Sequence, residues 1–516
     1  MISGHRLTKL APPLVLALSI ASCRHPRAPQ SDLNESLART ADSVRVTLRI
    51  PGLSIAVVRD GKVVLARGLG LADVEGGVPA TAETLYPIGS ITKTFTATLM
   101  LQLAEAGRLD LDHDIARFVD WEVPPDVRIR HVLSHTSEGV PGSRFSYSSR
   151  FNWLDNVVEA ATRESFRTLM VDRVLAPAAL SRTLPGEERD SYAESLAGLA
   201  KPYRVDTSGA VVRSTYPPMA LHSSSGLSST VMDLARYSIA LDDGRLLSPT
   251  ALGKAFSPAL SRTGQPLPYG SGWFTQVVGG ERVVWHGSWW PDAYSGLLVK
   301  VPARRLALVL LGNSDALSSP QGGASNVLLF PIANAFLRTF GVGDAELRGT
   351  SLVAAALTAA ARKERPKADS LLREALDCCA ADLASIGDDD RLRIFGESND
   401  PRVRSVGYEA GRRLVASFPA DLGIRFNLGM AYGRVRPALR IGGPEADEAT
   451  RVFSSILESG PAMPRWMEAW TSYLVAERIA EREPARAKVL AERARATGVD
   501  TDGLRARVAE LLRRLP

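Results

Sequence analysis

The sequence predicts an α+β fold, in which an antiparallel sheet is flanked by helices and carries an inserted all-α subdomain, followed by an all-α C-terminal domain. Strand patterns stand at both ends of the first two thirds of the chain, and helical patterns fill the space between them. After about residue 343 the strand signals end, and alanine, leucine, arginine and glutamate dominate. A chain of 516 residues that is 45% hydrophobic and 23% charged has room for two or three such domains.

The first predicted strands span residues 53–59 and 62–69, on either side of Asp60-Gly61, a strong two-residue hairpin turn. A second set lies far along the chain, at 272–278, 282–287, 295–301 and 306–312. Helical patterns between the two sets include residues 153–162 and 231–241. We therefore expect one antiparallel sheet that is closed by both ends of the domain.

The N-terminus has the pattern of an export signal. Arg6 and Lys9 precede a short apolar run at 10–20, which is too short to span a membrane as a mature helix. The run ends in Ile20-Ala21-Ser22-Cys23, which looks like a bacterial lipobox with Cys23 as the lipidated residue; an ordinary cleaved signal is the alternative. No apolar stretch of 18 or more residues follows, so we expect anchoring rather than spanning.

These observations predict four regions. Residues 1–22 are a signal peptide of the lipoprotein type, 23–32 a tether, 33–342 the α+β domain and 343–516 the helical domain. The expected location is the bacterial cell envelope, as an exported lipoprotein that faces the periplasm and is held at the membrane through Cys23. The net charge of +6 is modest and no basic helix stands out, so nucleic-acid binding is not expected.

The most informative stretch contains Ser90 and Lys93, within residues 87–95. If a helix begins at Ser90, the two side chains are three residues apart and share one face. The following run is apolar nearly all round, so this helix should be buried. A buried ammonium loses its proton more easily, and a neutral lysine can then activate a serine hydroxyl as a nucleophile. A serine cap beside a snorkelling lysine is the alternative for an isolated pair.

Two further segments accompany this pair: Phe145-Ser146-Tyr147-Ser148-Ser149, and Trp285-His286-Gly287-Ser288 on a predicted strand. Together the three segments resemble the motifs of the serine β-lactamase and penicillin-binding superfamily, in its class C β-lactamase-related branch of D-alanyl-D-alanine carboxypeptidases and esterases. Residues 51–58, 85–90, 130–137, 226–236 and 311–315 resemble the same family in the same order, over about 33–342. The resemblance implies a β-lactamase-like fold with Ser90 between the sheet and the helical subdomain.

The resemblance also implies residue roles. Ser90 matches the acylated nucleophile, Lys93 its proton acceptor, and Tyr147 the phenol that shuttles protons; whether lysine or tyrosine is the acylation base stays open. These three are the predicted catalytic residues. No metal and no cofactor are expected.

Five positions besides the catalytic residues are predicted to bind substrate: Ser149, His286, Gly287, Ser288 and Trp289. Ser149 stands where many family members have asparagine. His286, Gly287 and Ser288 match the family's Lys-Thr-Gly strand motif, and Ser288 replaces its final glycine, so a side chain is expected where substrate approaches. The backbone N–H groups of Ser90 and Trp289 would form the oxyanion hole.

The predicted function is a serine hydrolase that forms an acyl-enzyme on Ser90 and acts on an ester, amide or lactam bond of a small molecule or peptide. Because of Ser149 and Ser288, esterase or peptidase-like activity is favoured over β-lactamase activity. The alternative is a sensor that acylates without turnover, or a scaffold whose helical C-terminal domain binds a protein partner.

Other residues have competing interpretations. His131 and His135 are four apart and could hold zinc, but no third ligand is evident, so a structural turn is favoured. Trp289 and Trp290 could line an acyl pocket or simply pack. The adjacent Cys378 and Cys379 are expected in a helix core without a disulfide.

The C-terminal region contains a partial repeat pattern. Leu428, Gly429 and Tyr432, then Ala449 and Phe453, match tetratricopeptide positions, with Pro461 and a long turn near 436–443 completing the unit. Residues 466–494 have the pattern of a second, weaker unit. An irregular helical bundle is the equally favoured alternative, because two imperfect repeats are few for a solenoid.

Overall fold

The computed structural model describes residues 30–188, 190–206, 210–318, 326–342, 348–361, 363–385, 391, 395, 401–433, 444–459, 463–499 and 503–516. The predicted signal peptide and Cys23 lie outside these residues. Helix α1 (Gln30–Thr47) begins inside the predicted tether, so residues 30–32 are helical rather than part of a linker. None of the helices within the described ranges is long and apolar enough to cross a membrane.

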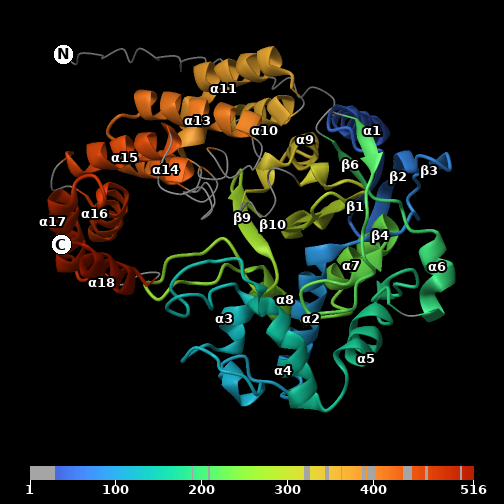
Figure 1. Ribbon diagram of the computed structural model, residues 1–516. Helices are drawn as coiled ribbons and strands as arrows, with labels where there is room; N and C mark the ends of the chain where they lie inside the picture. The colour runs from blue at the N-terminus through green and yellow to red at the C-terminus, as the bar shows by residue number, and fades with distance from the viewer. Residues whose placement is uncertain are drawn as a thin grey trace, which may run out of the picture.

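The first domain is built on a seven-stranded antiparallel sheet in the order β3-β2-β1-β12-β11-β10-β9 (Figure 1). Its strands are β1 (Gly52–Arg59), β2 (Lys62–Asp73), β3 (Val78–Pro79), β9 (Phe274–Val278), β10 (Glu281–Trp290), β11 (Tyr294–Val301) and β12 (Leu306–Gly312). The hairpin β1–β2 turns at Asp60-Gly61, where both residues have positive φ. Because β1 pairs with β12 from Leu53↔Gly312 to Arg59↔Leu306, the predicted closure of the sheet by both ends of the domain is confirmed.

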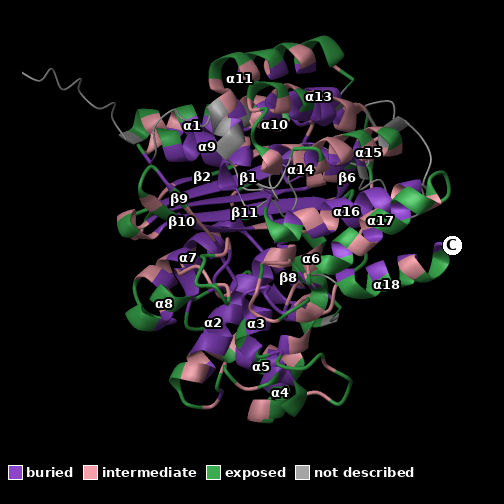
Figure 2. Cartoon of the chain, turned by 90° about the vertical axis from the view of Figure 1, so that its left-hand side faces the viewer, coloured by how far each residue is buried: buried purple, intermediate pink, exposed green. Residues whose placement is uncertain are grey.

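Helices cover both faces of this sheet, which Figure 2 shows as a buried layer across the middle of the molecule. On one face, α1 and α9 (Pro331–Thr339) pack together over the residues of β1 that include Ile55 and Val57. On the other face, Ala56 and Val58 contact the helical subdomain through α7 (Val231–Asp242). The period-2 alternation of the strand therefore builds two separate cores.

The inserted subdomain lies between β3 and β9. Its helices are α2 (Thr92–Glu105), α3 (Ile129–Leu133), α4 (Trp153–Thr162), α5 (Phe166–Met170), α6 (Ala193–Ala197), α7 and α8 (Pro249–Phe256). Short strands β4 (Tyr86–Pro87), β8 (Leu227–Ser229) and β5 (Leu184–Pro185) form a small sheet beside it, and β6 (Tyr203–Val205) pairs with β7 (Val211–Arg213). The helices predicted at 153–162 and 231–241 are confirmed within one residue.

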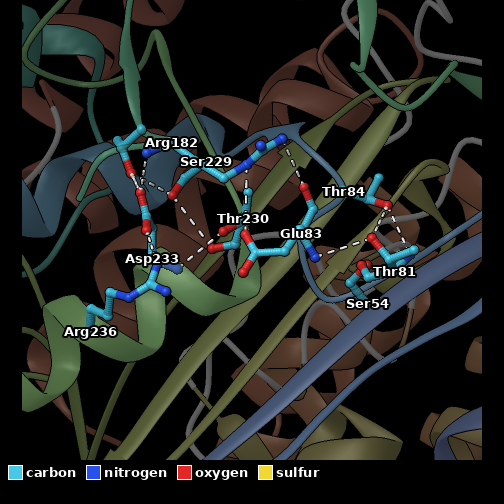
Figure 3. Close-up of polar contacts among 10 residues, drawn as sticks. Ser54, Thr81, Glu83, Thr84, Arg182, Ser229, Thr230, Asp233 and Arg236 are labelled. Carbon is cyan, nitrogen blue, oxygen red and sulfur yellow. Dashed lines mark hydrogen bonds and ion pairs between the residues drawn. The ribbon is translucent and has the colours of Figure 1, made fainter. Parts of the chain in front are cut away.

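A buried carboxylate fixes the start of α7, as Figure 3 shows. Asp233 is fully buried and its two oxygens accept hydrogen bonds from the Arg182 backbone N–H at 2.8 Å, the Thr183 hydroxyl at 2.9 Å and the Arg236 guanidinium at 2.5 Å. Its own N–H donates to Thr230, the N-cap residue. This network ties α7, which packs on the sheet, to the segment that precedes β5.

The C-terminal region is helical in every segment that the structure describes. Helices α10 to α18 follow one another along an arc in Figure 1, at α10 (Arg348–Ala361), α11 (Arg365–Ser385), α13 (Pro401–Ser417), α14 (Leu422–Gly433), α15 (Pro444–Leu457), α16 (Arg465–Ile479), α17 (Pro484–Ala496) and α18 (Leu504–Arg514). Consecutive helices contact each other, as in a helical repeat. A Cβ on Gly429 would lie 2.7 Å from Phe453, so this glycine lets α14 and α15 approach closely. Pro461 and the long turn before Gly443 lie outside the described residues.

The prediction for the adjacent cysteines is wrong. Cys378 and Cys379 form a disulfide within α11, and the backbone of Cys379 is not helical, with φ −148° and ψ 31°. Cys378 is exposed and Cys379 half-buried rather than in a helix core. The helix breaks at this point, and the break lets two neighbouring side chains meet that a regular helix would direct apart.

Candidate active site

Ser90 lies in a short 3₁₀ turn, η1 (Gly89–Ile91), between strand β4 and helix α2. Gly89 has φ +43°, and a Cβ there would come within 3.3 Å of the Ser288 Cβ on β10. A glycine is therefore needed to bring this turn against the sheet. Ser90 is half-buried and lies at the boundary between the sheet and the helices.

Lys93 lies one turn further on, in the first turn of α2, and only 4% of its surface is exposed. Its Nζ donates to Ser90 Oγ and to the backbone carbonyl of Ser224, both at 3.1 Å. The burial of α2 was predicted from its apolar run and is confirmed. Desolvation lowers the pKa of Lys93 from 10.5 to about 7, so a large share of its amines are neutral at neutral pH.

Tyr147 completes the group of three predicted catalytic residues. The Ser90 side chain lies near enough to the Tyr147 hydroxyl to oppose part of the rise in its pKa that burial causes, and the Lys93 Nζ lies 5.0 Å from the centre of the tyrosine ring. The residue as a whole is 38% exposed. Desolvation of the hydroxyl raises the pKa of Tyr147 above 10, so the phenol keeps its proton at neutral pH and can donate it. The structure thus brings Ser90, Lys93 and Tyr147 together.

The third motif lies on β10, whose side chains alternate between the two faces of the sheet. His286 points to the helical side, where its Nδ1 donates to the Gly287 carbonyl at 2.7 Å and its Nε2 accepts from the Tyr269 hydroxyl at 2.9 Å. Burial lowers the pKa of His286 to about 3. This side chain is therefore neutral and offers no positive charge to a substrate.

Ser288 and Trp289 differ in accessibility. Ser288 is buried, with its side chain between Gly89 and Gly296, so the structure does not bring it to the open part of the site as the sequence suggested. Trp289 is 47% exposed, and its Nε1 donates to Asp315 at 3.4 Å. Strand β9 pairs with β10 only as far as Trp285, and β10 lies against η1, so the segment carrying the predicted oxyanion donors runs beside Ser90.

Ser149 is exposed at the start of the 3₁₀ turn η3 (Ser149–Asn152). At the end of that turn, the Asn152 side-chain oxygen accepts from the hydroxyl of Ser224, the residue whose carbonyl binds Lys93. Neither Asn152 nor Ser224 stands in a sequence pattern that predicts a functional residue. Only the fold brings this loop to Lys93, since 131 residues separate Lys93 from Ser224.

The two histidines of the 130–137 segment take part in turns, as expected. The Nδ1 of His131 accepts from the Arg128 N–H at 3.1 Å, and the Nδ1 of His135 accepts from the Ser148 N–H at 3.0 Å. Within the described ranges, no three histidine, cysteine or carboxylate side chains are grouped as metal ligands. The His135 ring stacks on Tyr147, a contact that no pattern in the sequence predicts.

Comparisons with known proteins agree with this arrangement. Residues 37–329, more than half of the chain, match the family model described as Beta-lactamase. Protein flp of Staphylococcus aureus (strain MW2) is 24% identical over 307 residues, which cover 52% of this chain and 60% of that protein. A D-aminopeptidase of Gluconobacter oxydans (strain 621H) is 25% identical over 317 residues, covering 54% and 58%. The chain thus spans less than two thirds of the length of these curated relatives.

Solved structures share the fold. An octameric penicillin-binding protein homologue from Pyrococcus abyssi is 24% identical, with a TM-score of 0.50 over 61% of this chain and 78% of that one. The crystal structure of SurE is 23% identical, with a TM-score of 0.51 over 61% of this chain and 78% of that one. Residues 37–329, which match the Beta-lactamase family model, contain the sheet, the helical insertion and the Ser90–Lys93–Tyr147 group, and the chain therefore belongs to the beta-lactamase family.

Proposed function

We propose that the protein is a serine hydrolase that forms an acyl-enzyme on Ser90 and releases it with water. The observation that carries this proposal is the contact of 3.1 Å between Lys93 Nζ and Ser90 Oγ in a desolvated environment. A base with a pKa of about 7 is suited to take a proton at neutral pH. Family membership supports the same class of reaction.

In the proposed acylation step, the Ser90 oxygen attacks the substrate carbonyl and its proton passes to Lys93. Tyr147, which keeps its proton, then protonates the leaving group and recovers a proton from Lys93. In deacylation, water attacks the ester on Ser90, and the same two groups return the proton to the serine. Lys93 is the better base of the two, because desolvation favours its neutral form and disfavours the phenolate of Tyr147.

The developing oxyanion would be held by the backbone N–H groups of Ser90 and Trp289. One such donor contributes about 2.7–4 kcal/mol in enzymes where it has been removed. Both belong to elements in contact, η1 and β10.

The substrate that we propose is an ester or amide whose acyl group carries no negative charge near the reacting carbonyl. The neutral His286 supplies no cation there, and Ser149 replaces the asparagine expected from the family motif. The similarity to a D-aminopeptidase makes D-amino-acid amides the first peptide substrates to test.

A fluorophosphonate probe tests the proposal, with Ser90→Ala as the control. Labelling of the wild type that disappears in Ser90→Ala is the expected result, and an unlabelled wild type would refute the hydrolase. Hydrolysis of a p-nitrophenyl ester, a D-amino-acid p-nitroanilide and a chromogenic cephalosporin, followed in parallel, then ranks ester, amide and lactam substrates.

The second candidate is an acyl-binding sensor. The departures at Ser149 and Ser288 from the family motifs favour it, because they change the surroundings of the acyl group while leaving Ser90, Lys93 and Tyr147 in place. An acyl-enzyme that forms but persists for hours in intact-mass measurements would support the sensor.

We also propose that the protein is exported and anchored through lipidated Cys23, with the helical region from residue 343 available to a protein partner. The apolar run and the lipobox-like sequence before Cys23 support the anchor. Loss of the protein from the membrane fraction in Cys23→Ala is the expected result, and unchanged membrane association would argue against lipidation.

A further inference from the structure

His135 lies directly behind Tyr147, and its backbone is unusual. It follows α3 in a turn with φ +53° and is 1% exposed. Histidine is among the few residues other than glycine that are enriched in this left-handed region. The turn directs both the carbonyl and the ring of His135 toward the segment that carries Tyr147.

His135 holds the chain on both sides of Tyr147. Its backbone carbonyl accepts the Ser146 N–H at 2.7 Å, and its Nδ1 accepts the Ser148 N–H at 3.0 Å. These two donors belong to the residues immediately before and after the tyrosine. One residue therefore fixes the backbone from which the phenol projects.

The imidazole also supports the phenol ring itself. The two rings stack with centroids 4.2 Å apart and 27° between their planes. Phe151 at 5.2 Å and Tyr269 at 4.9 Å enclose the imidazole on other sides. Because the imidazole is itself enclosed, it is a fixed support for the Tyr147 ring and limits the movement of that ring away from Ser90.

The imidazole stays neutral in this environment. Its Nδ1 accepts a hydrogen bond, so its single proton is on Nε2. Burial, the nearby Lys93 ammonium and His286 lower the pKa of His135 well below 6.5. The Nε2 has no hydrogen-bond partner among the described residues, so the one hydrogen bond found there for this side chain is the one to the Ser148 N–H, next to Tyr147.

We propose that His135 is a positioning residue for the reaction: by binding Ser146 and Ser148 and stacking on the phenol, it holds the Tyr147 hydroxyl at Ser90. This role rests on the proposed function, in which Tyr147 relays the proton of Ser90. His135 itself touches neither Ser90 nor Lys93 through a hydrogen bond in the described part of the chain.

Two variants each keep one part of the contact between His135 and the Tyr147 segment and remove the other part. His135→Asn keeps a side-chain acceptor and tolerates the left-handed backbone but loses the ring, whereas His135→Phe keeps a ring and loses the acceptor. We expect either variant to lower the rate constant of Ser90 labelling by a fluorophosphonate about 10- to 100-fold, the loss typical of a displaced reacting group. Either variant that folds is sufficient for the test.

The deciding measurement is a double-mutant cycle with Tyr147→Phe. If His135 acts through the Tyr147 hydroxyl, adding His135→Asn or His135→Phe to Tyr147→Phe should change the labelling rate less than about twofold. A merely structural role would lower the rate by the same factor in both backgrounds, and that result would overturn the proposal.

His131→Asn is the matched control, because this histidine accepts a backbone N–H in the same segment but stays away from Tyr147. Its labelling rate should match the wild type. If the wild type is labelled and both His135 variants are labelled as fast as the wild type, the positioning role alone is overturned. A wild type that does not label would overturn the proposed function, and the positioning role with it.

Discussion

Lys93 should favour catalysis but lower the stability of the fold. Its ammonium is buried, and no carboxylate is among the groups that shift its pKa. A lysine with the ordinary pKa of 10.5 is neutral in about one molecule in 3,000 at pH 7, whereas a pKa of about 7 makes about half of them neutral. The labelling rate of the wild type should therefore rise with pH through about 7 and then level off.

Two substitutions separate the base from the charge. Lys93→Arg keeps a cation that does not deprotonate in proteins, and Lys93→Met keeps the approximate volume without a base. Both should lower the labelling rate about 10²- to 10⁴-fold, which corresponds to about 3–5 kcal/mol in the activation free energy. A Lys93→Arg protein that labels within about threefold of the wild type would refute the assignment of Lys93 as the base.

Stability should change in the other direction in Lys93→Met. The unfolded chain keeps the lysine proton up to about pH 10.5, while the folded state releases it near 7, so between these values the unfolded state binds more protons and wild-type stability rises with pH. The full difference of about 3.5 pKa units corresponds to about 4–5 kcal/mol of destabilisation below pH 7. In Lys93→Met the Ser224 carbonyl loses its hydrogen-bond donor, and this loss offsets about 1–3 kcal/mol of the gain from removing the buried charge.

We therefore expect Lys93→Met to unfold in urea with a free energy about 2 kcal/mol above the wild type at pH 7. This advantage should shrink as the pH approaches 10, and circular dichroism at several pH values measures it. A Lys93→Met protein that is less stable than the wild type at pH 6–7 would show that burial of the ammonium is not costly, and the reasoning from desolvation would fail.

Three further predictions concern the structure around the site. Asp233→Ala should lower the free energy of unfolding by about 3–5 kcal/mol, because it leaves buried donors from the Arg182 segment unpaired; a loss below about 1 kcal/mol in urea titrations would contradict this. Gly272→Ala should destabilise the protein by about 1–3 kcal/mol and slow labelling, because its Cβ would lie 2.8 Å from the Lys93 carbonyl; Gly264→Ala, also at positive φ but in open space, is the control that should keep the labelling rate. Phe453→Ala should cost about 3–5 kcal/mol in the C-terminal helices, visible as an earlier thermal transition, with the Ser90 labelling rate unchanged; slower labelling would show that these helices support the site.

Local patterns in the sequence were sufficient for the architecture of the first domain. The hairpin at Asp60-Gly61 requires positive φ at both turn residues, and the alternation of β1 divides its side chains between two cores. The Ser90–Lys93 spacing and the apolar run after it predicted one shared face in a buried helix. This was possible because the periodicity of a helix and the burial of its faces depend on residues that are close in the sequence.

Other features depend on contacts between distant segments, which no local pattern encodes. The cysteine pair was misread because a break in α11 cannot be inferred from residues with ordinary helix propensity. The side chain of Ser288 turned toward Gly89 and Gly296 because the pleat of β10 and the close approach of η1 decide which face it takes.

The sequence alone thus determined the order of the elements that hold Ser90, Lys93 and Tyr147, and it predicted that these three residues carry the chemistry. The tertiary structure decided how strongly Lys93 is desolvated, that His286 is neutral, and that His135 supports Tyr147 from behind. The physical reason is that a pKa depends on the dielectric and the charges contributed by every segment around a group, whereas periodicity depends only on the segment itself.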